Sequence, residues 1–148
     1  MKKIIFIFLP ICLLLASSCG SSKAVYSYDA NIYKYKYVVF GDNITGDRTL
    51  DDIVIQVENI IASTSLAVVT PQEALDLLQQ NKEILTPNIS VTSEKWDGGH
   101  TYITINFFDF KTNKSVLVVK SSGIGLTISH DQSIALNSIE KKLRDIFY

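Results

Sequence analysis

A few short groups of residues have types and spacings that could do chemistry. One is the oxygen-rich stretch of residues 41–52, where a calcium loop would need ligands at set positions around a central glycine. With Gly46 as that glycine, the first ligand position falls on Gly41, which has no side chain. The stretch is therefore better interpreted as a turn and helix cap, and we expect no metal site.

The histidines and glycines predict little chemistry. His100 and His130 are the only histidines, and neither has a His, Cys or Glu partner at metal-ligand spacing. No Gly-x-Ser-x-Gly nucleophile elbow is present, although distant residues could still assemble a Ser-His-Asp site. Gly123 and Gly125 lie where phosphate-binding glycines would, but the third glycine is absent. We expect no catalytic residue, no cofactor and no enzyme.

The start of the chain predicts an export signal. Two lysines precede the apolar run of residues 4–16, and three small residues ending at Ser18 precede Cys19. The run contains Pro10 and is shorter than the roughly 20 apolar residues that a membrane-spanning helix needs. Residues 1–18 are therefore expected to be removed rather than to span a membrane.

This segment resembles a bacterial lipoprotein signal peptide, in which a large aliphatic residue and two small residues precede the lipidated cysteine. Leu15 lies four residues before Cys19 and Ala16 three before it, which matches a relaxed form of the pattern. The resemblance implies acylation of Cys19, as by palmitate, and attachment to a cell-envelope membrane. Gly20, and no acidic residue, immediately follows Cys19, which in that family implies the outer membrane, facing the periplasm. The alternative is an ordinary secretory signal cut near residues 16–18.

The composition of the mature chain excludes several function classes. Residues 19–148 suffice for one domain with its own core, but not for two. Cys12 leaves with the signal and Cys19 would be blocked, so no thiol remains for disulfides, metal ligation or nucleophilic chemistry. The balance becomes 12 basic against 15 acidic residues, which gives no general attraction for nucleic acid.

The first half of the mature chain predicts a tether and then alternating strands and helices. Residues 19–30 are Ser-rich without a sustained period, and we interpret them as a lipidated tether to a domain at residues 31–148. The run at 32–40 predicts a strand, and the apolar spacing over 50–61 predicts a helix. A short β-branched strand and a helix with a capping box and proline follow, over 65–81.

The second half predicts an antiparallel meander and a final helix. Alternating runs lie at 89–95, 101–110 and 115–120, with turn residues between them. Phe107 and Phe108 break the alternation, which predicts a bulge or burial on both faces. The order β-α-β-α-β-β-β-α predicts a single α/β domain, bordering on α+β, with a mixed sheet of about five strands, a parallel βαβ start and the C-terminal helix packed on the sheet.

That order resembles the α/β domain shared by the curli-secretion lipoprotein, the penicillin-binding-protein-activator lipoproteins and the TolB amino-terminal domain. The matching features are the strand ending at residues 38–40, the strand at 66–69 that leads into the helix start at 70–75, and the strand-turn-strand at 103–114. Asn113 stands where that group usually has glycine. The resemblance implies an envelope lipoprotein that binds other proteins and catalyses nothing.

Aromatic residues supply the candidate partner-binding positions. Tyrosines are concentrated near the expected tether, and Trp96 lies beside a glycine turn. Because Tyr and Trp are enriched at protein interfaces and can stack on sugars, we take Tyr33, Tyr35 and Trp96 as candidates. The alternative is that alternate tyrosines cover one sheet face while Lys34 and Lys36 face water.

The sequence therefore predicts a non-catalytic, lipid-anchored envelope protein that serves as a protein-binding or assembly module, with another envelope protein as its partner. The alternatives are a tethered small-ligand- or glycan-binding domain or, with less support, a hydrolase. An exposed aromatic or apolar patch, or an unpaired sheet edge, favours the first function. A concave pocket with convergent polar side chains favours the others.

Overall fold

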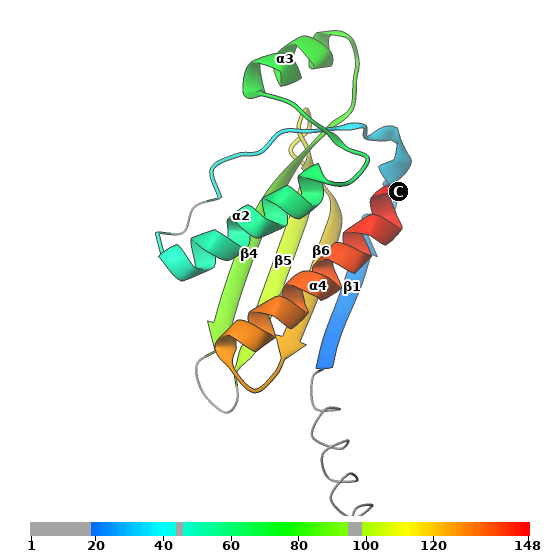
Figure 1. Ribbon diagram of the computed structural model, residues 1–148. Coiled ribbons are helices and arrows are strands. Elements are labelled where there is room, and N and C mark those ends of the chain that lie inside the picture. Colours follow the sequence, from blue (N-terminus) through cyan, green and yellow to red (C-terminus); the bar gives the residue numbers. More distant parts are fainter. Residues whose placement is uncertain (1–18, 44–45, 95–98) are drawn as a thin grey trace, which may run out of the picture.

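The computed structural model describes residues 19–43, 46–94 and 99–148, and it confirms the predicted α/β domain (Figure 1). A mixed six-stranded sheet has the order β1-β6-β5-β4-β2-β3. The strands are β1 (Cys19–Tyr26), β2 (Tyr37–Val38), β3 (Ala67–Val68), β4 (Ile84–Glu94), β5 (His100–Asp109) and β6 (Ser115–Ile124). The helices are the 3-10 turn η1 (Ile32–Lys34), α2 (Arg48–Ala62), α3 (Pro71–Gln79) and α4 (Ile128–Phe147).

Strand β1 corrects the expectation of a tether. Residues 19–26 pair antiparallel with β6 along their whole length, from Cys19 opposite Ile124 to Tyr26 opposite Leu117. The segment lacks an alternating hydrophobic pattern, so only pairing with a strand almost a hundred residues later makes it extended. The sheet therefore begins at Cys19 and has one strand more than expected.

The remaining strands follow the predicted topology. Strand β2 pairs in parallel with both β3 and β4, which is the expected parallel start. Strands β4, β5 and β6 form the antiparallel meander, and their register shifts between Phe107 and Phe108, which confirms the predicted bulge. Strand β4 begins at Ile84, earlier than predicted, and contains Pro87.

Local capping decides where other elements begin. The predicted strand over 32–40 is reduced to β2, because the Asn31 side chain accepts from the Tyr33 amide and caps the turn η1. Helix α2 is capped by the side chain of Asp47, and α4 by that of Thr127. At α3 both halves of the predicted capping box between Thr70 and Glu73 are present.

Helices α2 and α4 cover one face of the sheet, and α3 lies at one end of it (Figure 1). Buried and exposed residues alternate along β4 and β5, so the helix-facing side chains form the core and the opposite face is open. The Phe107 and Phe147 rings meet edge to face at 5.5 Å in that core. The core also contains Ile53, Val54, Val57, Ile61, Ile103, Ile105, Leu117, Val119, Ala135, Ile139 and Leu143.

Two glycines opposite each other on β1 and β6 let α4 lie close to the sheet. Gly20 pairs with Gly123, and a Cβ built on Gly123 would meet the Asp131 carbonyl oxygen and lie 2.6 Å from the Ala135 nitrogen. A Cβ on Gly20 would lie 2.5 Å from Ser138 Oγ. The first contact involves helix backbone, which cannot turn aside as a side chain can.

We expect Gly123→Ala to lower the free energy of unfolding by about 2–4 kcal/mol, because α4 must shift away from β6. Urea unfolding followed by circular dichroism measures this. Gly41→Ala is the matched control, since nothing lies within 4 Å of a Cβ there and the change should be close to neutral. Equal effects of the two substitutions would contradict the close packing of α4.

Candidate functional site

Cys19 occupies the first position of β1, at the end of the sheet where α4 begins (Figure 1). The side chain is an exposed free thiol. Its cross-strand partner is Ile124, and both lie on the open face of the sheet, because Gly20 and Gly123 face α4. The residue proposed for lipid attachment is thus accessible, and it is separated from the folded domain by no spacer.

The aromatic candidates are not brought together. Tyr33 is exposed in η1, with 76% of its surface accessible, and remains a candidate. Tyr35 is only 4% exposed, so the expectation that it contacts a partner is wrong: the turn η1 directs it into the domain. Trp96 lies outside the described residues. The alternative of tyrosines alternating on one sheet face is wrong too, because a 3-10 turn replaces the strand there.

Tyr35 instead holds η1 against the turn between β5 and β6. Its hydroxyl donates to Asp109 Oδ2 at 2.9 Å, and Asp109 Oδ1 accepts from the Thr112 amide at 2.7 Å and its hydroxyl at 2.8 Å. Burial raises the pKa of Tyr35, and the hydrogen bond to Asp109 adds to this. Burial opposes ionisation of Asp109, but the bonds from Thr112 and Tyr35 and the charge of Lys34 outweigh it and lower the pKa of Asp109. These hydrogen bonds have a structural role, and we call the cluster of Tyr35, Asp109 and Thr112 the Asp109 lock.

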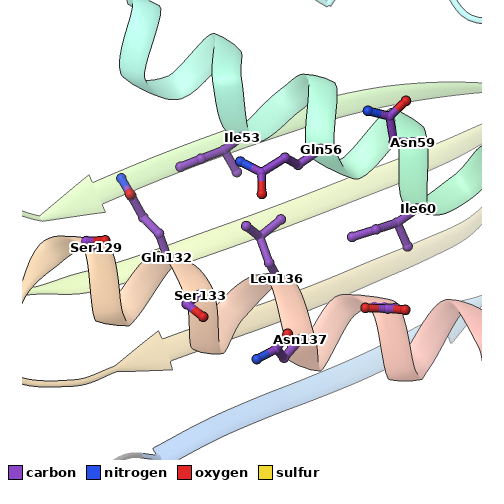
Figure 2. A pocket seen from close by; sticks show the side chains of 10 residues that line it. Ile53, Gln56, Asn59, Ile60, Ser129, Gln132, Ser133, Leu136 and Asn137 are labelled. Carbon is purple, nitrogen blue, oxygen red and sulfur yellow. The ribbon is translucent and has the colours of Figure 1, made fainter.

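A polar groove of about 440 Å³ lies between α2 and α4 (Figure 2). Apolar side chains and four amides from both helices line it, and in Figure 2 Gln56 and Leu136 point toward each other across it. The lining residues are Ile53, Gln56, Asn59, Ile60, Ser129, Gln132, Ser133, Leu136, Asn137 and Glu140. Such a surface can exchange hydrogen bonds with a neutral polar ligand, but it offers few charges.

Two buried polar groups at the start of α4 were missed by the sequence analysis. Asp131 is fully buried, and within the described ranges neither of its carboxylate oxygens has a hydrogen-bond partner. The nitrogen of the Gln132 side chain is buried without a partner as well. The first helical turn favours a negative charge, which offsets part of the cost of burying Asp131. No local pattern in the sequence around Asp131 predicts this burial.

The two histidines make separate contacts. His100 Nδ1 is 3.7 Å from Glu94 Oε2, and its ring stacks on Tyr102. His130 Nδ1 accepts from the Leu126 amide at 3.5 Å. In the part of the chain that the structure describes, no cluster of three or more His, Cys, Asp or Glu could hold a metal ion. The candidate loop at residues 41–52 is described except for 44–45, and Asp47 in it caps α2.

The outer side of β1 is an open sheet edge. The Ser27 amide donates to the Val116 carbonyl, and an antiparallel ladder alternates, so Val25 bonds to β6 while Ala24 and Tyr26 direct their backbone groups outward. Val25 and Tyr26 are exposed, at 62% and 48%. Among the described strands, none pairs with that edge. This is the unpaired edge that an interaction module is expected to have.

None of the described helices is long and apolar enough to cross a bilayer. The apolar residues of α4 instead form one stripe that faces the sheet, where Ala135, Ile139 and Leu143 are fully buried.

The Asp109 lock makes stability depend on pH. Because the folded pKa of Asp109 lies below the unfolded value of about 3.9, its stabilisation is complete above that value and is lost as pH falls through the folded pKa. The free energy of unfolding in urea should be higher for the wild type than for Asp109→Asn at neutral pH, and this difference should shrink near pH ~2. Asp145→Asn, at an exposed position, should show little difference at either pH. A pH-independent effect of Asp109→Asn would contradict the lock.

Comparisons with known proteins establish the fold but no family. No family model and no curated protein matches the chain. Among solved structures, a single-substitution variant of the PelC dodecamer from Paraburkholderia phytofirmans is 15% identical, with a TM-score of 0.55. A second structure of the PelC dodecamer from that organism is 16% identical, with a TM-score of 0.52. Each alignment covers 87% of this chain and 98% of PelC. Neither is a curli-secretion, penicillin-binding-protein-activator or TolB protein, so that resemblance stays an expectation.

Proposed function

We propose that this protein is a non-catalytic, lipid-anchored lipoprotein of the cell envelope that works as an assembly module, binding protein partners that include further copies of itself. The observation that carries the proposal is the open edge of β1, with its row of outward backbone groups beside exposed Val25 and Tyr26. An unpaired edge strand is a template for pairing with another chain.

The likeness to PelC supports assembly. The two PelC structures described above are dodecamers, and the alignments cover nearly all of PelC and most of this chain. We extend to this chain only the capacity for self-association, at this or another surface. Repeated copies would present several anchors and several binding surfaces at once, which strengthens a weak contact through effective concentration.

The position of Cys19 supports the lipid anchor. A cysteine that receives a lipid must be reachable, and Cys19 is exposed at the first position of the sheet. The apolar run and the small residues that precede it resemble those of a bacterial lipoprotein signal peptide. We infer that the anchored protein lies at the outer membrane, facing the periplasm, because no acidic residue immediately follows Cys19.

The contacts of the polar residues favour binding over catalysis. Among the described residues, the His100 ring lies beside Glu94 and the His130 ring accepts from the Leu126 amide, rather than either ring contacting a serine or threonine hydroxyl. The ionised Asp109 is occupied by Thr112 and Tyr35. A nucleophile needs an adjacent base, and the described contacts provide no such pair.

The groove between α2 and α4 favours a second candidate function, a small-ligand- or glycan-binding domain. Four amides from the two helices line it, and they can exchange hydrogen bonds with a polar ligand (Figure 2). The two functions predict different effects on the groove. Binding of a soluble polar ligand should shift the NMR signals of the amides in α2 and α4, whereas edge assembly should leave these signals unchanged.

The edge contact is tested by a matched pair of proline substitutions. Ala24→Pro removes an outward amide and blocks the edge, so it should lower self-association at least about tenfold while the domain stays folded. Val25→Pro removes an amide that bonds to β6, so it should destabilise the domain itself. Light scattering of the purified processed protein measures association, and circular dichroism measures folding. A monomeric wild type, or an Ala24→Pro protein that assembles normally, would contradict edge assembly.

The anchor and the partner are tested together by cross-linking in intact cells. The wild-type protein should carry a lipid on Cys19 and recover copies of itself or one stoichiometric envelope partner, while Cys19→Ala should lose the lipid and the envelope partner. Mass spectrometry of the mature N-terminus and of the cross-linked proteins gives both results. An unmodified N-terminus, or no partner above background, would sink this proposal.

A further inference from the structure

The end of the domain that carries Cys19 also exposes a row of large apolar side chains. Ile124 lies opposite Cys19 at the end of β6, Leu126 follows in the connection to α4, and Ile128 is the first residue of α4. Their exposed fractions are 37%, 76% and 40%. Exposed apolar side chains are ordinary when scattered singly, but three at alternate positions of one five-residue stretch form a patch.

We propose that Ile124, Leu126 and Ile128 form a membrane-contacting tip that inserts into the interface of the bilayer beside the lipid on Cys19. The inference rests on the lipid anchor of the proposed function and deepens it, because it assigns the orientation of the domain and residues that touch the membrane. The occupant of the tip is the headgroup and upper acyl region of that bilayer.

The absence of a spacer carries the argument. The residues from Cys19 onward are paired with β6, so an acyl group on the Cys19 sulfur begins one side chain away from the end of β1. A flexible tether would leave the domain free to turn, whereas this attachment brings the end of the sheet to the bilayer surface. The opposite end of β1 then lies about 25 Å farther out, at roughly 3.4 Å per strand residue.

The side chains at that end suit an interface. On insertion, the Ile and Leu side chains pass from water into the bilayer interface. This transfer adds to the membrane affinity that the acyl chains supply. Lys23 and Lys120 are cross-strand partners on the open face, two positions beyond the row of Ser21 and Ser122. Both lysines are exposed and can attract anionic headgroups. Glu94, an exposed carboxylate in the described part of this end, lies beside His100, which can neutralise it when protonated.

Hydrogen bonds to backbone amides keep the tip rigid. Thr127, between Leu126 and Ile128, caps α4 by accepting from the His130 amide at 3.2 Å. The Leu126 amide in turn donates to His130 Nδ1. The connection is therefore held at Leu126 and at Thr127. Its apolar side chains stay directed away from the domain, and they need no further ordering on insertion.

Spin labels test the tip directly. In the processed protein the lipid blocks Cys19, so Leu126→Cys is a unique thiol for a nitroxide after reconstitution into vesicles of phosphatidylethanolamine and phosphatidylglycerol. Its label should be accessible to oxygen and protected from a water-soluble nickel chelate. Tyr28→Cys, beyond the other end of β1 and fully exposed, is the matched control and should show the opposite pattern.

The outcomes separate the tip from the anchor. If mass spectrometry finds the lipid and the Leu126 label matches the Tyr28 label, the tip is overturned while the anchor stands. If no lipid is found, the anchor fails, and the same labels are measured on a Cys12→Ser, Cys19→Ser protein added to the vesicles. Protection of the Leu126 label then still supports the tip, and equal accessibility of the two labels overturns it.

Charge substitution gives a second readout. In the Cys19→Ser protein, the double change Leu126→Asp and Ile128→Asp should lower vesicle partitioning at least about tenfold, because both side chains must then stay in water. Leu75→Asp, at a half-exposed position on α3 at the far end of the domain, should leave partitioning unchanged. Equal effects of the double change and the control would overturn the tip.

Discussion

The close packing of α4 on the Gly20–Gly123 pair is the contact on which the rest of the arrangement depends. Without Cβ atoms at these two positions, the helix backbone comes into contact with β6 and its side chains reach β1. The same helix brings Ile139 and Phe147 into the core against β5 and β6. Covering the β1–β6 pair from one face also turns a polar, Ser-rich segment into a strand of the sheet.

That strand gives the domain its functional geometry. With β1 in the sheet, Cys19 becomes the corner of a rigid body instead of the start of a flexible linker, and the outer edge of β1 becomes a surface. Because α2 and α4 cover one face only, Cys19, the open face and the edge are all left accessible (Figure 1). The proposed attachment to a membrane would use the first residue of β1, and the proposed attachment to another copy of the chain would use its outer edge.

The surfaces proposed for function consist of backbone groups and a few apolar side chains. An open edge, a tip of Ile124, Leu126 and Ile128, and a neutral amide-lined groove do not require particular residue types at fixed spacing. Sequence motifs such as the calcium-type loop or the paired glycines therefore do not indicate these surfaces. Gly123 is needed for helix packing, and Asp47 for capping α2.

The sequence by itself determined the order of the elements from β2 onward, the capping box at Thr70, the bulge at Phe107 and the buried stripe of α4. These features depend on hydrophobic period and on capping between residues a few positions apart, which the chain encodes locally. Only the tertiary structure decided that residues 19–26 form a strand, that Tyr35 is buried and that Cys19 lies beside Ile124. Each of these depends on a contact between segments 70 or more residues apart, such as the Tyr35–Asp109 hydrogen bond, and no local pattern records which distant surface a polar or glycine-rich segment will meet.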